Sequence, residues 1–176
     1  MIKAKAHLIE DISPYEQNGY VCFWKPGDPE GIFSNWAVTP FVSGGIRYPT
    51  AEHYMMAEKA LLMGDDKTRQ QILSSTNPSV VKKLGQQVKP WDENSWLEHR
   101  CRIMYEACLA KFTSSPDLRE ILLATDNKVL VEASPYDKIW GVGVLGSDPR
   151  AKNPRQWKGL NLLGKVLMKV RDDLRK

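Results

Sequence analysis

The segment Tyr48–Ala60 constrains the fold most, because it carries the clearest start of a helix in the chain. Thr50 is a residue type favoured at helix N-caps, and Pro49 before it favours an extended approach to the cap. Helical spacing then places Glu52 and Lys59 near one face. Glu52 falls in the first turn, where unpaired backbone N–H groups favour an ionised carboxylate. The segment therefore predicts a capped helix that presents a charged carboxylate.

Patterns elsewhere predict more helices around a small sheet. Aromatic and β-branched residues predict strands at residues 20–24, 39–42, 46–48 and 129–131. N-cap residues and apolar periodicity predict helices at residues 51–63, 66–73, 78–84, 96–112, 116–123 and 161–175. The expected caps are Asp65 or Asp66 for the helix to residue 73, Asn77 for the next, and Asn94 or Ser95 for the long helix from residue 96. Residues 1–24 otherwise look extended, and residues 133–158 form a long irregular loop. The elements predict one α+β domain over residues 1–176, helix-rich with a small sheet.

Composition narrows the class of protein. The chain has 176 residues, 42% of them hydrophobic, which is enough for one well-developed core, and no Gly/Ser-rich or Pro-rich linker divides it. Its cysteines, Cys22, Cys101 and Cys108, form no CxxC pair, so we expect reduced thiols in a cytoplasmic protein. No apolar run has the length of a signal peptide core or a membrane span, and we expect no membrane association. The net charge of +4 suits an anionic ligand such as a phosphate.

A glycine-rich run invites a dinucleotide-binding interpretation that its context argues against. Gly141-Val142-Gly143-Val144-Leu145-Gly146 matches the GxGxxG pattern. That motif needs a helix directly behind the glycines, so that the helix N-terminus meets the pyrophosphate. Ser147-Asp148-Pro149-Arg150 and Asn153-Pro154 follow instead, which are residues typical of a loop. We therefore predict a loop and not a Rossmann fold.

Metal and nucleophile chemistry find little support in the sequence. The three histidines, His7, His53 and His99, are isolated, and no ligand cluster has zinc spacing, so we expect neither a metal nor another cofactor. No GxSxG motif is present, although a histidine acting with a distant serine or cysteine stays open. The basic residues are spread along the chain, which argues against a dedicated nucleic-acid groove.

Carboxylates near a tryptophan give the clearest chemical signal. Glu52, Glu132 and Asp137 are the candidates, and Trp140 follows Asp137 by three residues. Cleaving a C–N bond at an anomeric carbon requires stabilisation of an oxocarbenium-like ribosyl centre, which an ionised carboxylate supplies. A proton donor assists departure of the base, and an indole ring can stack on it. These residue types therefore suit N-glycoside hydrolysis.

An ordered series of short matches resembles the NADAR family, the YbiA-like N-glycosidases. The matching stretches are Phe33-Ser34-Asn35-Trp36, Tyr48-Pro49-Thr50-Ala51-Glu52-His53-Tyr54 with Lys59-Ala60, Trp96 ahead of Arg102-Ile103-Met104, Ala110-Lys111-Phe112, Leu130-Val131-Glu132 through Asp137-Lys138-Ile139-Trp140-Gly141, Gly159-Leu160-Asn161-Leu162-Leu163-Gly164 and Leu167-Met168. The resemblance implies a single α+β domain that hydrolyses N-glycosidic bonds to ribose phosphates. It implies as substrates the ribosylamino-pyrimidine 5′-phosphates of early riboflavin synthesis, or ADP-ribose attached to guanine, free or in nucleic acid.

The resemblance also implies a set of site residues. Glu52 would be the essential carboxylate, and Trp96, Asp137 and Trp140 would share its site. Contacts to phosphate or ribose would come from Asn35, Lys59 and Asn161. Apart from the resemblance, we expect Lys59 or Arg47 to bind the phosphate through charge-assisted hydrogen bonds.

We expect Glu52 to be ionised, with a lowered pKa, and to stabilise the ribosyl cation or orient the attacking water. Whether Asp137 binds ribose hydroxyls or assists the departing base stays open. The two tryptophans would stack on the base or enclose it. A segment at residues 145–157 is longer than in the shorter bacterial members, which bears on the pocket for the leaving base.

Two alternatives belong to other classes of protein. The same pocket would serve a module that binds ADP-ribose or a nucleotide without cleaving it. A nucleic-acid interaction protein would bind with an affinity that falls steeply with salt concentration.

Overall fold

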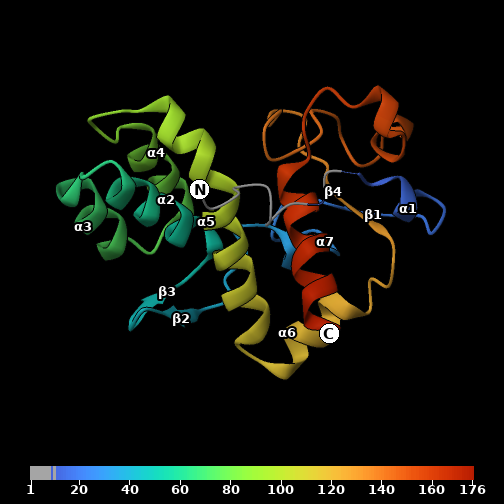
Figure 1. The fold of residues 1–176 in the computed structure, drawn as a ribbon, viewed down its shortest axis with the longest axis horizontal. Coiled ribbons are helices and arrows are strands. Elements are labelled where there is room, and N and C mark those ends of the chain that lie inside the picture. The colour runs from blue at the N-terminus through green and yellow to red at the C-terminus, as the bar shows by residue number, and fades with distance from the viewer. Residues whose placement is uncertain (1–8, 10) are drawn as a thin grey trace.

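The computed structural model describes residue 9 and residues 11–176, and its order of elements is that of an α+β chain (Figure 1). The helices are α1 (Ser13–Glu16), α2 (Ala51–Leu62), α3 (Asp66–Ser74), α4 (Pro78–Gln86), α5 (Glu93–Thr113), α6 (Pro116–Leu123) and α7 (Leu162–Leu174). The strands are β1 (Tyr20–Phe23), β2 (Phe41–Ser43), β3 (Ile46–Tyr48) and β4 (Val129–Glu132), and short 3₁₀ helices are η2 (Gly31–Phe33), η3 (Pro149–Lys152) and η4 (Pro154–Gln156). These elements confirm the predicted helix-rich fold.

The N-terminal part departs from the extended conformation that was predicted for residues 1–24. Residues 1–8 and residue 10 lie outside the described residues. Within the described part, Ser13–Glu16 form the short helix α1, which begins with Pro14 in its first turn. Proline is tolerated there because the first helical N–H groups have no partner within the helix.

The predicted start of α2 is confirmed in detail. Thr50 has an extended backbone, and its Oγ1 accepts a hydrogen bond from the His53 N–H at 3.3 Å. After the helix, Gly64 adopts a φ of +72°, a left-handed conformation that side chains disfavour. Of the two candidate caps of α3, Asp65 is the one that caps it through its side chain, and Asn77 caps α4 as predicted.

The central helix α5 begins earlier than predicted. Asn94 or Ser95 was expected to cap a helix from residue 96, and this prediction is wrong. Asp92 caps it instead, because its carboxylate accepts hydrogen bonds from the N–H groups of both Asn94 and Ser95. The helix then runs for 21 residues and packs against α2 and α7.

The predicted small sheet consists of two separate strand pairs. Strands β2 and β3 form an antiparallel hairpin through Gly44 and Gly45. Strands β1 and β4 lie parallel, with Tyr20 opposite Val129 and Phe23 opposite Glu132. Parallel pairing brings the carboxyl ends of two strands that are distant in sequence to the same edge.

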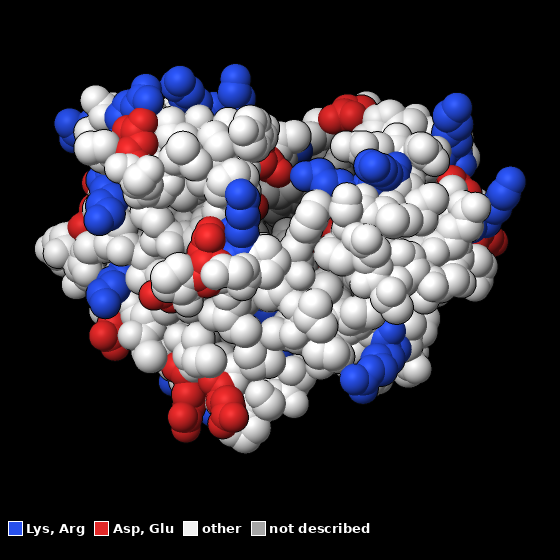
Figure 2. All heavy atoms as spheres, turned by 180° about the vertical axis from the view of Figure 1, so that it is seen from behind, with Lys and Arg blue, Asp and Glu red and all other residues white. Residues whose placement is uncertain are grey.

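The cavity described below lies between two halves of the molecule. Figure 1 shows α2, α3, α4 and the β2–β3 hairpin on one side, and β1, β4 and the loop before α7 on the other, with α5 and α7 side by side between them. Figure 2 shows the opposite face, which is hollowed between the halves and carries acidic and basic side chains at the rim. No helix within the described residues is long and apolar enough to cross a membrane.

Candidate active site

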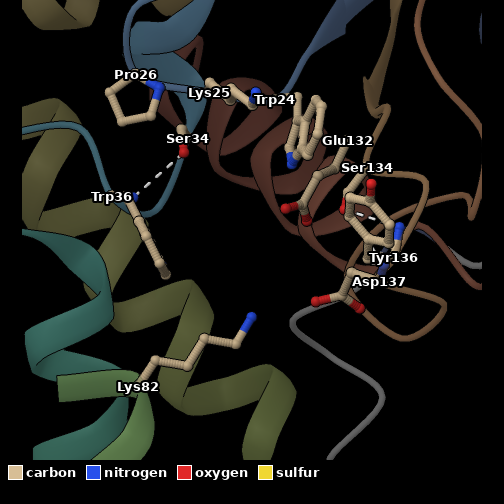
Figure 3. Close-up of a pocket in the computed structure, with 10 residues that line it drawn as sticks. All are labelled: Trp24, Lys25, Pro26, Ser34, Trp36, Lys82, Glu132, Ser134, Tyr136 and Asp137. Atoms are coloured by element: carbon tan, nitrogen blue, oxygen red, sulfur yellow. Dashed lines mark hydrogen bonds between the residues drawn. The ribbon is translucent and has the colours of Figure 1, made fainter. Parts of the chain in front are cut away.

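A cavity of about 460 Å³ opens at the carboxyl ends of β1 and β4 (Figure 3). Its walls come from both halves of the molecule. The residues that line it are Trp24, Lys25, Pro26, Ser34, Trp36, Lys82, Glu132, Ser134, Tyr136 and Asp137. A site at the carboxyl ends of parallel strands follows a general tendency of α/β proteins.

Glu52 lies at the start of α2, and only 4% of its surface is exposed. It is not itself one of the residues that line the cavity. Its backbone N–H donates to the Asn35 carbonyl at 3.0 Å, which ties the helix start to the segment that carries Trp36. The Trp36 side chain donates a hydrogen bond to the Glu52 carboxylate. Trp36 therefore connects Glu52 to the cavity, because Trp36 itself lines the cavity.

The expected lowering of the Glu52 pKa is wrong. Burial, with a contribution from the Asp137 charge, raises the pKa of Glu52 to about 7 against the lowering effects of Lys82, the Trp36 hydrogen bond and Lys59. A helix N-terminus favours a carboxylate by only about 0.3–1 kcal/mol at exposed sites, which is too little to offset such burial. Glu52 is thus poised between its acid and its ionised form near neutral pH.

Glu132, a candidate carboxylate by sequence, is a second buried acid at the end of β4. Its Oε2 atom is buried and has no hydrogen-bond partner among the described residues. Burial, the Asp137 charge and the Glu52 charge raise the pKa of Glu132 to about 8, while Lys82 lowers it. At neutral pH Glu132 is therefore mostly a protonated carboxylic acid that faces the cavity.

Asp137 is held by the turn that follows β4. Its Oδ1 accepts hydrogen bonds from the backbone N–H groups of Ile139 at 2.9 Å and Trp140 at 2.8 Å. Its own N–H donates to Ser134 Oγ at 3.2 Å. Figure 3 shows the carboxylates of Glu132 and Asp137 and the Lys82 ammonium pointing into the same space. Three carboxylates and one lysine thus interact around one cavity.

Aromatic rings and a second lysine form the rest of the wall. The rings of Trp24 and Tyr136 lie 6.0 Å apart between centroids at an angle of 54°, and Tyr136 is 85% exposed. The Lys25 ammonium lies 4.5 Å from the centre of the Trp24 ring, and the Lys82 ammonium lies 5.8 Å from that of Trp36. Flat apolar surface and positive charge therefore sit side by side at the mouth of the cavity.

Six residues were predicted to contact substrate, and none of them is among the described residues that line the cavity. They are Asn35, Arg47, Lys59, Trp96, Trp140 and Asn161. Trp96 is buried, with the Lys59 ammonium 5.3 Å from its ring centre. That ammonium donates to the Gly85 carbonyl at 2.7 Å, so Lys59 acts on Glu52 through its charge. Arg47 lines a separate groove between the β2–β3 hairpin and α5.

Asn161 has a role different from the predicted ligand contact. It has no exposed surface, and its φ of +53° places it in the left-handed region at the start of α7. Its Oδ1 accepts from the Glu132 N–H at 3.0 Å, and its Nδ2 donates to the Leu130 carbonyl at 2.9 Å. Both ends of its amide are therefore used to hold β4, and contact of Asn161 with phosphate or ribose stays a prediction.

Asn35 and Trp140 support the site through their backbones. Asn35 is buried and accepts the Glu52 N–H, whereas Trp140 is half-buried against the core and donates its N–H to Asp137. The structure instead brings Trp24, Trp36, Lys82 and Tyr136 to the cavity. Of these, only Trp36 carried a signal in the sequence, because it closes the first matching stretch, Phe33–Trp36.

Other predicted features of the sequence can be placed in the structure. The glycine-rich run from Gly141 is followed by the short η3 and not by an α-helix, which confirms the loop prediction. Among the described residues, no group of three or more His, Cys, Asp or Glu side chains is arranged to hold a metal ion. The thiols of Cys22, Cys101 and Cys108 are free.

Comparison with known proteins places these features in a family. The sequence matches the model of the NADAR domain over residues 22–175. It is 42% identical over 147 residues to N-glycosidase R617 of Acanthamoeba polyphaga mimivirus, and the aligned region covers 81% of this chain and 86% of R617. It is 34% identical over 176 residues to the chloroplastic riboflavin biosynthesis protein PYRR of Zea mays, covering 93% of this chain but only 26% of PYRR.

A solved structure supports the same relationship. N-glycosidase YbiA of Escherichia coli is 36% identical to this chain over 159 residues, with 90% of each protein covered. The NMR structure of YbiA superimposes with a TM-score of 0.75 at 32% identity, covering 98% of this chain and 91% of that chain. The α+β fold of this chain is thus the fold of YbiA.

Proposed function

The chain belongs to the NADAR family and is an N-glycosidase, and we propose that it hydrolyses the bond between a phosphorylated ribosyl group and a heterocyclic base at the cavity beside Glu52. One observation carries this proposal. Glu52 and Glu132 are two interacting buried carboxyl groups whose pKa values are raised to different extents, about 7 and about 8. Pairs of carboxyl groups with separated pKa values divide the roles of base and acid in glycoside hydrolysis.

The two glutamates take complementary parts in the proposed reaction. As the C–N bond breaks, its electron pair goes to the base nitrogen, and the Glu132 carboxyl donates its proton to the departing base. The Glu52 carboxylate stabilises the positive charge that develops on the anomeric carbon. A water molecule then adds to that carbon, and its proton passes to Glu52. Proton exchange with solvent restores both groups.

The remaining lining residues fit the parts of such a substrate. Trp24 and Tyr136 offer ring surface on which a flat heterocycle stacks. Lys25 and Lys82 offer charge-assisted hydrogen bonds to a phosphate. Asp137 has one carboxylate oxygen committed to backbone N–H groups, and we assign its other oxygen to the ribose hydroxyls.

We propose two classes of substrate that share this chemistry. The ribosylamino-pyrimidine 5′-phosphates are small, and the name of the relative PYRR, which refers to riboflavin biosynthesis, supports them. ADP-ribose attached to guanine carries the same bond between ribose and base. We further propose a cytoplasmic location, which the free thiols support.

The test is release of free base from both substrate classes by the wild type and by two matched variants. Glu52→Gln removes the carboxylate that the Trp36 side chain binds, and we expect base release to fall by roughly a hundredfold or more. Glu58→Gln removes a carboxylate from the same helix α2 outside the cavity lining, and we expect near-normal rates. Equal rates in wild type and Glu52→Gln would refute the assignment. Saturable binding of every ribosylated compound without turnover would favour the binding module instead.

A further inference from the structure

A fully buried lysine hydrogen-bonds the backbone just ahead of Trp36. Lys111, near the end of α5, has 1% of its surface exposed. Its ammonium donates to the Ile32 carbonyl at 2.5 Å and to the Ser34 carbonyl at 3.1 Å. Both acceptors belong to η2 and the residue that follows it. A buried ammonium is costly unless it is well hydrogen-bonded, and here one short backbone segment supplies those bonds.

This segment leads directly to the contacts of Glu52. Ser34 is followed by Asn35, whose carbonyl accepts the Glu52 N–H at 3.0 Å. Trp36 comes next and donates its side-chain hydrogen bond to the Glu52 carboxylate. The position of both contacts depends on where residues 32–34 lie.

The same segment also contacts the part of the wall that carries Lys25 and Pro26. Gly31 has no room for a side chain, because an added Cβ would lie 2.4 Å from the Lys25 carbonyl oxygen and 2.3 Å from that of Pro26. Lys25 and Pro26 line the cavity. Residues 31–36 are thus packed between the substrate cavity and the Lys111 ammonium.

We propose that Lys111 is a positioning residue for the N-glycosidase site, which holds the 32–36 segment so that Asn35 and Trp36 bind Glu52. This proposal rests on the proposed function of Glu52. Lys111 acts through the segment and touches no substrate. Its loss leaves two buried carbonyls without their donor and frees the segment to move, so the Trp36 bond to Glu52 weakens.

The electrostatic consequence has a definite sign. The Trp36 hydrogen bond favours the ionised form of Glu52 and lowers its pKa. Weakening that bond therefore raises the pKa of Glu52. The other charged groups that act on Glu52 and Glu132 come from α2, α4, β4 and the following turn, and they are Lys59, Lys82, Glu132 and Asp137. None of them contacts Lys111 through the hydrogen bonds given above, so substitution of Lys111 leaves their charges in place.

The experiment follows the carboxyl carbon of Glu52 by ¹³C NMR during a pH titration, with the signal assigned through Glu52→Gln. We expect the midpoint to rise by about one pH unit in Lys111→Met and in Trp36→Phe. Arg171→Met is the matched control. Arg171 is also fully buried and donates to the Lys128 carbonyl at 2.8 Å, but it has no contact with residues 31–36 among those described. We expect the wild-type midpoint in this control.

Kinetics and a second variant complete the test. Lys111→Met should lower kcat by roughly ten- to a hundredfold with a smaller change in KM, because the substrate contacts remain but the reacting geometry is loosened. Should Lys111→Met fail to fold, Lys111→Gln replaces it, since the shorter amide fills less space and reaches one carbonyl at most; a smaller rise in the midpoint is expected. A folded Lys111 variant with the wild-type midpoint would overturn the proposal. The titration needs no turnover, so absence of glycosidase activity in the wild type would refute the proposed function without deciding the role of Lys111.

Discussion

Glu52 and Glu132 differ in acidity because their surroundings differ. Both are buried, which raises both pKa values, but Glu52 receives the Trp36 hydrogen bond and lies near two lysines. Glu132 has a buried oxygen without a hydrogen-bond partner among the described residues, and the charge of Glu52 contributes to the rise in its pKa. Glu52 therefore ionises first as the pH rises, and its charge then holds the proton on Glu132. This order gives one base and one acid in the same pH range.

The first prediction concerns the pH dependence of base release. In the wild type, kcat/KM should rise with pH as Glu52 ionises near 7, and fall as Glu132 loses its proton near 8. Glu132→Gln should abolish the fall at high pH and lower the maximal rate by roughly a hundredfold, because glutamine cannot donate the proton. Rate measurements between pH 5 and 10 check this. A descending limb that persists in Glu132→Gln would assign the acid to another residue.

The sequence predicted the carboxylates of the site better than its walls. Glu52, Glu132 and Asp137 were identified because few other residue types perform this chemistry. Trp24 and Lys82 lie in a strand end and on an exposed helix, where nothing local distinguishes them from structural residues. The raised pKa of Glu52 was also missed, because a first-turn position is visible in the sequence but burial by distant elements is not.

At the level of elements, the start of α2 is fixed by a reciprocal pair of side chains. Thr50 Oγ1 accepts the His53 N–H and lies 2.7 Å from His53 Nδ1. His53 Nε2 lies 3.1 Å from the Ser75 carbonyl, which can only accept a hydrogen bond. Nε2 therefore carries the proton, and Nδ1 accepts from the Thr50 hydroxyl. The cap thus links α2 to the residue that follows α3, and it sets the position of Glu52.

The second prediction tests this cap. Thr50→Ala removes the acceptor for the His53 N–H and the donor to its ring, and we expect it to lower the free energy of unfolding by about 2 kcal/mol. Thr50→Ser retains the hydroxyl and should cost less than half as much. Urea denaturation of the three proteins at one pH measures the difference. Equal stability of the alanine and serine variants would show that the hydroxyl contributes little.

Elements were predicted well where their signals are local. Thr50, Asp65 and Asn77 cap helices through contacts within three residues, so the sequence located them to within one residue. Asp92 was missed because Asn94 and Ser95 beside it are also good cap residues. The pairing of β1 with β4 joins residues such as Phe23 and Glu132, which are far apart in the chain. No local pattern indicates such a partner. The pairing, and with it the edge at which Trp24 meets Glu132, therefore came only from the structure.

On the scale of the whole molecule, the site lies between two halves and lowers the stability of the folded protein. The cavity takes Trp36 and Lys82 from one side and Trp24, Glu132 and Asp137 from the other (Figure 3). Burying ionisable carboxyl groups at this junction is unfavourable when they are charged. The arrangement that prepares the chemistry should therefore reduce stability at the pH where the enzyme works, a known trade-off between activity and stability.

The last prediction concerns this loss of stability, which should depend on pH. An unfolded glutamate has a pKa of about 4.3, whereas those of Glu52 and Glu132 are raised to about 7 and about 8. Between pH 4.5 and 8 the folded protein thus holds protons that the unfolded chain releases, so the contribution of these groups to stability is present at low pH and is lost as the pH rises through 7 and 8. The double variant Glu52→Gln/Glu132→Gln stays neutral throughout, and we expect its stability relative to the wild type to be several kcal/mol higher at pH 8 than at pH 5, on the order of 6. Urea unfolding at both pH values tests this, with the exposed Glu120→Gln as a control that should track the wild type. A double variant whose stability relative to the wild type is no higher at pH 8 than at pH 5 would mean that these carboxyl groups do not carry raised pKa values in the folded protein.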